Sequence, residues 1–208
     1  MFSRDQRRVA RWLKADPAQR FPRLVTMAAL SIQQPWSSVG DQLADVDAGE
    51  DSRFLWGHKR QTFEWFNQQA DHGPRLYHVV DVAVRAGRIA RAHRLLMLIP
   101  GIGLVKGGFI LQLGWGVSGC LDTVNVQRLG LPTAPLRSRK ECGPRTQAKR
   151  IKTYLRMIEA AGGTRQLWDD WCRTLAEKDR SFKSAADVSS RHWRYLMDWK
   201  PVEEELPV

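Results

Sequence analysis

A short proline–glycine turn inside an otherwise helical sequence constrains the fold of this chain most strongly. Residues 99–103 read Ile-Pro-Gly-Ile-Gly, and an apolar stretch with few polar side chains follows over 104–113. Pro100 favours the end of the preceding helix, while Gly101 and Gly103 permit a tight turn and leave backbone N–H groups uncovered. Such groups at the start of a helix bind anions, phosphate among them. The segment therefore predicts two helices joined by a turn that is able to grip a phosphate.

Helical periodicity predicts most of the remaining secondary structure. Apolar residues recur at helical spacing, bounded by capping residues, prolines or glycines, over 5–13, 21–29, 56–66, 76–98, 147–161, 164–178 and 185–199. Gly87 is a potential break in the long 76–98 pattern, and the acidic segment 39–51 is open to a weak helix or a surface loop. No alternating run indicates a strand. The predicted class is all-α, with residues 1–208 as a single helical domain or as two small lobes around a cleft.

The charge of the chain favours a polyanionic partner. Lys and Arg number 33 against 22 Asp and Glu, which gives a formal net charge of +11. Nucleic acid is the leading candidate for that partner. No apolar run approaches the length of about 20 residues that spans a bilayer, and the basic N-terminal segment lacks the apolar centre of a signal peptide. We therefore expect an intracellular protein without a membrane partner.

Cysteine and histidine spacing indicates neither a metal site nor a cofactor. Cys120, Cys142 and Cys172 are odd in number and far apart, and they form no CxxC pair. The five histidines show no ligand spacing and no arrangement with Ser and Asp that suggests a nucleophile. We expect reduced cysteines, no metal and no cofactor.

The turn and the segment after it carry a family resemblance. The run from Leu98 through Lys106 and Phe109, followed by Cys-Leu-Asp-Thr-Val-Asn-Val-Gln-Arg-Leu-Gly at 120–130, resembles the helix-hairpin-helix DNA glycosylase superfamily. That superfamily includes the endonuclease III-type and adenine glycosylases. The similarity extends over about 95–131 and implies a glycosylase-like helical bundle, with the turn and the aspartate segment within about 85–131. The chain also looks like short, mostly uncharacterised tailed-phage members that share the Lys-small-small-Phe helix and the Gly-Cys-Leu-Asp-Thr segment.

The resemblance assigns a chemical role to Asp122. In the family, this carboxylate stabilises an oxocarbenium-like sugar or orients the attacking water, and a negative charge suits that developing positive charge. Aspartate before a helix is also a common N-cap. Asp122 is therefore expected to act in catalysis, to cap the helix that follows, or to do both. The cluster of four C-terminal cysteines that holds an iron–sulfur centre in some relatives is absent, so no such cluster is expected.

The position of Lys106 departs from that of the family's nucleophilic lysine. Bifunctional members carry the lysine two residues after the second glycine of the turn, where this chain has Val105. One residue corresponds to about 100° of rotation on a helix, which predicts that Lys106 points at the DNA backbone instead of into a pocket. Lys106 is thus mainly a candidate phosphate contact and only a weak catalytic candidate, and lyase activity is not expected.

Basic residues around the turn complete the predicted DNA-binding set. Arg85, Arg88, Arg91 and Arg94 recur every third residue and are expected to form a stripe on one helix face, beside the turn. The full set is Arg85, Arg88, Arg91, Arg94, Gly101, Ile102, Gly103, Lys106 and Arg128. A second basic group, Arg145, Lys149, Arg150, Lys152 and Arg156, is expected to flank a cleft. Each group is alternatively a solvated surface, and Trp115 either stacks on a base or is buried under the turn.

Three functions follow as hypotheses from these features. The first is a glycosylase-like enzyme that acts on a base extruded from DNA, which predicts a pocket beside Asp122. The second is a catalytically silent DNA-binding or virion structural protein on the same scaffold, with a filled pocket and a buried or capping Asp122. The third is a phage DNA-base modification transferase, which would need room for a second substrate. The expected partners are the DNA phosphate backbone and other phage proteins, in the cytoplasm of a bacterial host or in a virion.

Overall fold

The structure confirms the all-α class for the part of the chain that it describes. This part of the computed structural model comprises residues 2–32, 34–49, 56–68, 71–133, 136 and 142–197, and contains helices and no strand. The α-helices are α1 (Phe2–Ala15), α2 (Pro17–Leu30), α3 (Val39–Asp47), α4 (His58–Asn67), α5 (His72–Arg85), α6 (Ile89–Leu96), α7 (Leu104–Trp115), α8 (Thr123–Leu129), α9 (Pro144–Ala160), α10 (Gly163–Lys178) and α11 (Ala185–Met197). A short 3-10 helix, η1 (Trp36–Ser38), precedes α3. None of the described helices combines the length and apolar character needed to cross a bilayer.

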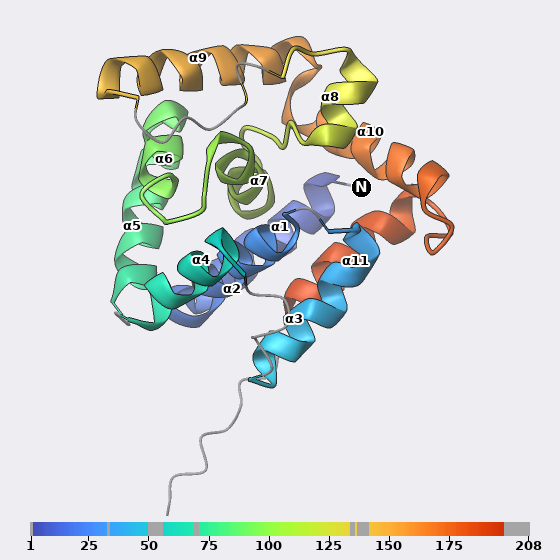
Figure 1. Cartoon of the computed structure of the whole chain (residues 1–208), viewed down its shortest axis with the longest axis horizontal. Coiled ribbons are helices and arrows are strands. Elements are labelled where there is room, and N and C mark those ends of the chain that lie inside the picture. The colour runs from blue at the N-terminus through green and yellow to red at the C-terminus, as the bar shows by residue number, and fades with distance from the viewer. Residues whose placement is uncertain are drawn as a thin grey trace, which may run out of the picture.

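Helix α7 lies in the centre of the molecule, and other helices surround it (Figure 1). Its sequence carries apolar residues or glycine on almost every side, and such helices are stable only when buried. Phe109, Ile110, Leu111 and Leu113 are all buried. Helices α1, α2 and α6 pack against α7. The apolar run after the turn therefore forms the core on which the rest of the fold is assembled.

The long helix predicted over 76–98 is two helices, so the predicted single stripe of arginines is wrong. Helix α5 ends at Arg85 and α6 begins at Ile89. Gly87 adopts a left-handed φ of 68°, and the Arg88 N–H donates to the Ala83 carbonyl at 2.8 Å, which closes the turn. The two helices then pack against each other. The four arginines consequently lie on α5, in the turn and on α6.

Helix α4 supports the turn at residues 97–103. The Thr62 hydroxyl of α4 donates to the Pro100 carbonyl at 2.6 Å. Gly101 has a φ of +82°, and a Cβ atom there would lie 2.6 Å from the His58 carbonyl oxygen. Residue 101 must therefore be glycine for two reasons, its backbone conformation and its contact with α4.

Tyr154 of α9 anchors the loop that leads to Asp122. Its hydroxyl donates to the Gly119 carbonyl at 2.7 Å and accepts a bond from the Leu121 N–H at 3.1 Å. Tyr154 belongs to a small apolar cluster of α9 residues with Leu104, Leu121 and Val126. This cluster places the start of α8 beside the first turn of α7.

Candidate functional site

One groove joins the first turn of α7 to the start of α8. Its volume is about 620 Å³, and its lining includes Lys106 from α7, Asp122 from the loop before α8, and Ser31 from the end of α2. A smaller cavity of about 200 Å³ shares Ser31, Asp122 and Val124 with the groove and extends toward α10. A pocket beside Asp122, as the enzyme hypothesis predicts, is therefore present.

Asp122 both caps α8 and lines the cavity. Its Oδ1 atom accepts a hydrogen bond from the Asn125 N–H at 2.9 Å, which is the N-cap contact. Its Oδ2 atom accepts a second bond, from the indole N–H of Trp171 at 2.8 Å. Burial raises the pKa of Asp122, while the Asn125 N–H, the positive charge of Lys106 and the Trp171 N–H act in the opposite direction. The two roles considered for Asp122 are thus compatible in one residue.

Lys106 points into the groove, contrary to the expectation from its offset in the sequence. Its Nζ atom donates to the Ser31 hydroxyl at 2.7 Å and lies 5.5 Å from the centre of the Phe109 ring. The end of α2 packs beside α7 at this position, so a long lysine side chain reaches from α7 to α2 across the floor of the groove. Burial lowers the pKa of Lys106, and the negative charge of Asp122 raises it again in part. Rotation along one helix was not sufficient to predict where this amine lies.

Aromatic rings form the wall of the cavity. Trp171 lies 5.5 Å from Trp36 at an interplanar angle of 81° and 5.5 Å from Trp168 at 32°, and Phe109 lies 5.6 Å from Trp36. A volume near 200 Å³ is below the range of about 300–1,000 Å³ of drug-sized ligand pockets. The cavity therefore suits a small planar group that stacks on indole faces.

The amide side chains in the cavity wall are already engaged within the protein. Gln112 accepts from the Cys120 N–H and donates to the Thr164 carbonyl, each at 3.1 Å. Asn125 donates to the Cys120 carbonyl at 2.8 Å and accepts from Arg128 at 3.3 Å. The cavity wall consequently offers a ligand its shape and its aromatic surface, and few free hydrogen-bonding groups.

Of the predicted turn residues, Gly103 at the start of α7 is best placed to meet an anion. Gly103 is the N-cap of α7, and within the described part of the chain no side-chain hydrogen bond caps that end of the helix. Ile102 is 4% exposed, and its N–H already donates to the Ile99 carbonyl at 3.1 Å, so Ile102 is not a phosphate contact. Gly101 faces α4 on one side, as described above.

The predicted arginine contacts divide into paired and unpaired residues. Arg85 forms an ion pair with Asp81 at 2.8 Å, and Arg128 pairs with Asp170 at 3.0 Å, so both are committed to structural contacts. Arg88, Arg91 and Arg94 are exposed and form no ion pair with any described residue. The latter three remain candidates for contact with a polyanion.

Trp115 is part of the core packing and lines neither the groove nor the cavity. Its ring lies 6.2 Å from Phe21 and 5.6 Å from Tyr77, and its indole N–H donates to Asp81 at 3.1 Å. Trp115 is partly buried, and its contacts are with α2 and α5 instead of with the turn. Because Trp115 lines neither the groove nor the cavity, it is not placed to stack on a base held there.

Sequence reasoning missed two buried polar features, one in the cavity wall and one on α4, the helix that contacts the turn. Trp171 is 49 positions from Asp122, and the only local signal was its spacing of three from Trp168 on one helix. Lys59 of α4 is 2% exposed, and its Nζ atom has no hydrogen-bond partner in the described part of the chain. Burial lowers the pKa of Lys59, and the nearby charge of Lys106 lowers it further. No sequence pattern distinguished Lys59 from an ordinary surface lysine.

Comparisons of the chain with known proteins identified no relative. Models of known protein families, curated proteins and solved structures gave no match to the chain. Among the described residues, no group of three or more His, Cys, Asp or Glu side chains could hold a metal ion.

Proposed function

We propose that this chain binds duplex DNA at the turn before α7 and draws one extruded base into the cavity beside Asp122. The observation that carries the proposal is the common groove of Lys106 and Asp122 next to the uncapped N-terminus of α7. The N–H groups at that end of α7 would hold a backbone phosphate, in the manner of helix-hairpin-helix proteins. The net charge of +11 favours the same polymer.

The chemistry that this site supports best is removal of the base. The bond between C1′ and the base nitrogen breaks and the base departs with the bonding electrons. The oxygen of a water molecule then bonds to C1′ to leave an abasic sugar, and the proton that this water gives up ends on the nitrogen of the departed base. The Asp122 carboxylate would stabilise the positive charge that develops on the sugar, as negative groups do in such sites. Because burial raises the pKa of Asp122, the rate is expected to rise with pH through that raised pKa as the carboxylate ionises.

Binding at the turn is tested with two surface substitutions of equal charge. Leu98 lies in the turn and is 66% exposed, whereas Ala44 is an exposed residue of α3, a helix that carries acidic and no basic side chains. Leu98→Glu places a negative charge where the phosphate is expected, so its dissociation constant for a fluorescent duplex should rise at least tenfold. Ala44→Glu is the matched control and should bind within twofold of the wild type. Equal binding by both variants would refute the role of the turn.

Base release is tested separately with wild type and Asp122→Asn on duplexes that carry a panel of natural and modified bases. Asn retains the ability to cap α8 but removes the negative charge. Loss of base release in Asp122→Asn with intact DNA binding is the expected result. If Asp122→Asn released the base at the wild-type rate, a mechanism that depends on the Asp122 carboxylate would be excluded.

One observation favours a second candidate, a catalytically silent DNA-binding protein. Both oxygens of Asp122 already accept hydrogen bonds from the protein, one from the Asn125 N–H and one from Trp171. A purely structural carboxylate would have the same arrangement. DNA binding at the turn without base release from any duplex of the panel would establish this alternative.

A further inference from the structure

Helix α9 carries a straight row of positive charges on its outer face. Arg145, Lys149, Lys152 and Arg156 are all exposed, and their spacing of four, three and four residues places them on one side of the helix. We call this row the α9 stripe. At a rise of about 1.5 Å per residue, the stripe is roughly 16 Å long.

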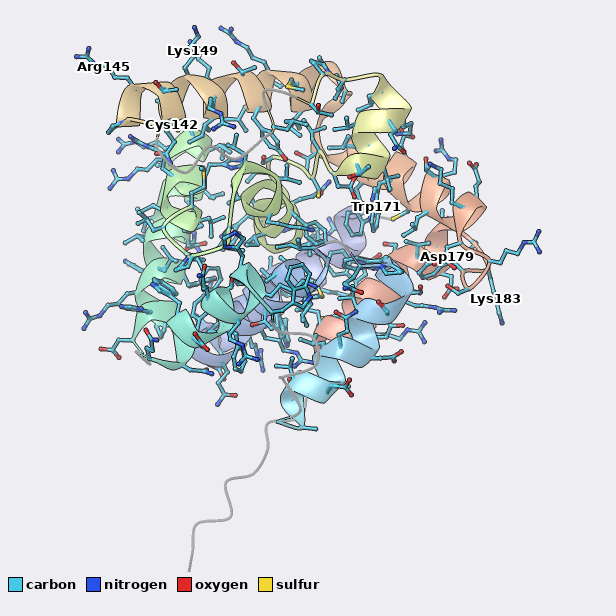
Figure 2. All side chains as sticks on the ribbon, in the orientation of Figure 1. Cys142, Arg145, Lys149, Trp171, Asp179 and Lys183 are labelled. Carbon is cyan, nitrogen blue, oxygen red and sulfur yellow. The ribbon has the colours of Figure 1, made fainter. Side chains whose placement is uncertain are left out.

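The α9 stripe points away from the core and from the groove. The opposite side of α9 carries Ile151, Tyr154 and Ile158, which are buried. Tyr154 bonds the loop before Asp122, so the stripe lies on the far side of α9 from that loop. In Figure 2, Arg145 and Lys149 project outward from α9, at the edge of the molecule. The expectation that this basic group flanks the cleft therefore does not hold for these four residues.

The cations of the stripe lack partners in the described part of the chain. No ion pair or hydrogen bond involves the side chain of any of the four. Elsewhere, Arg75, Arg165 and Arg191 each pair with an aspartate four residues away in the chain. Like charges at this spacing destabilise a helix by about 0.2–0.5 kcal/mol per pair. The stripe is thus unfavourable in the free protein, and a bound polyanion would relieve the repulsion.

We propose that the α9 stripe is a second surface for the phosphate backbone of duplex DNA, separate from the groove. A duplex carries one negative charge per about 1.7 Å of its axis, so a 16 Å row of cations faces several phosphates at once. A small anion would engage only one or two of these side chains. The proposal extends the proposed function, because both surfaces bind the same polymer, but it requires neither the turn nor Asp122.

The test compares two triple variants that remove the same charge from two helices. Helix α1 also carries exposed cations that form no ion pair with any described residue, so it matches the stripe in charge and exposure and differs in its place on the molecule. The α9 variant carries Lys149→Gln, Lys152→Gln and Arg156→Gln, and the α1 control carries Arg7→Gln, Arg11→Gln and Lys14→Gln. Each triple variant lowers the net charge by three, from +11 to +8. Glutamine keeps a high helix propensity, so both variants should melt like the wild type.

Binding to a fluorescent duplex is measured by anisotropy over a series of NaCl concentrations. Each phosphate contact contributes about 0.9 to the slope of log K against log salt, so the α9 variant should lose about 2 to 3 from that slope. Its dissociation constant near 0.1 M NaCl should rise at least tenfold, and the α1 control should stay within twofold of the wild type. An unchanged slope in the α9 variant, or an equal loss in both variants, would overturn the proposal.

Two further measurements distinguish the α9 stripe from the proposed turn site and from a membrane-binding surface. If Leu98→Glu binds normally while the α9 variant loses affinity, the proposed role of the turn fails and the stripe remains. If Leu98→Glu alone loses affinity, the stripe fails and the turn remains. Vesicles of phosphatidylcholine with phosphatidylserine serve as the membrane probe. If the α9 variant loses vesicle binding and keeps DNA binding, the surface recognises lipid headgroups and the DNA proposal is overturned.

Discussion

The same substitution, glycine to alanine, should change the stability of the protein very differently at two neighbouring glycines of α7. A Cβ atom on Gly108 would lie 2.2 Å from the Gly119 carbonyl oxygen and 2.6 Å from the Tyr154 hydroxyl. These two groups hydrogen-bond each other, so Gly108→Ala must both displace backbone and break a buried bond. On Gly107 the nearest atom is the Nδ1 of His93 at 3.4 Å, an ordinary contact distance.

The expected sizes follow from these distances. Overpacking costs about 1–3 kcal/mol, an unsatisfied buried hydrogen-bonding group costs about another 1–3, and replacement of a helical glycine by alanine returns roughly 1. Gly108→Ala should therefore lower the free energy of unfolding by about 3 kcal/mol. Gly107→Ala should leave it unchanged or raise it by up to about 1 kcal/mol. For a chain of this size, about 3 kcal/mol corresponds to a drop in Tm of roughly 6–12 °C.

Urea denaturation followed by circular dichroism measures both variants under identical conditions. Equal stability of Gly108→Ala and Gly107→Ala would refute the close approach of α7 to the loop at Gly119. It would also remove the physical basis for the position of Asp122, because the same loop leads to that carboxylate.

The remaining predictions concern buried polar groups. Asp122→Ala should lower the free energy of unfolding, measured in urea, by about 2–4 kcal/mol, because it removes an N-cap and leaves the Trp171 N–H without its acceptor. A loss below about 0.5 kcal/mol would contradict both contacts. Burial lowers the pKa of His93 to about 4, so the folded state binds fewer protons than the unfolded state between that value and about 6.5. Stability should fall by roughly 3 kcal/mol as the pH decreases across that window, and His93→Gln should flatten the profile of unfolding midpoints. Lys59→Met removes a buried ammonium without a hydrogen-bond partner in the described chain and should raise stability at pH 7 by about 1 kcal/mol. The wild type should also gain stability as the pH rises toward 10.5, because the pKa of Lys59 is lowered in the folded state, whereas a parallel rise in Lys59→Met would show that another group is responsible.

Local patterns in the sequence were sufficient for most helices. Segments predicted over 147–161, 164–178 and 185–199 correspond to α9, α10 and α11, because periodic apolar residues and nearby caps are properties of the local chain. The segment 76–98 failed as one helix, although Gly87 marked the place of the break. Periodicity continued across the turn, and only the packing of α5 against α6 determined that the chain reverses there.

The sequence alone determined the all-α class and the tight turn at Pro100, and it offered the cap at Asp122 as one of two roles, since each depends on residues close together in the chain. Only the tertiary structure decided which side chains share the groove. The contact between Trp171 and Asp122 joins residues 49 positions apart, and that between Lys106 and Ser31 joins residues 75 apart. Such contacts depend on how α2, α7 and α10 pack, and no period within a single helix specifies that packing.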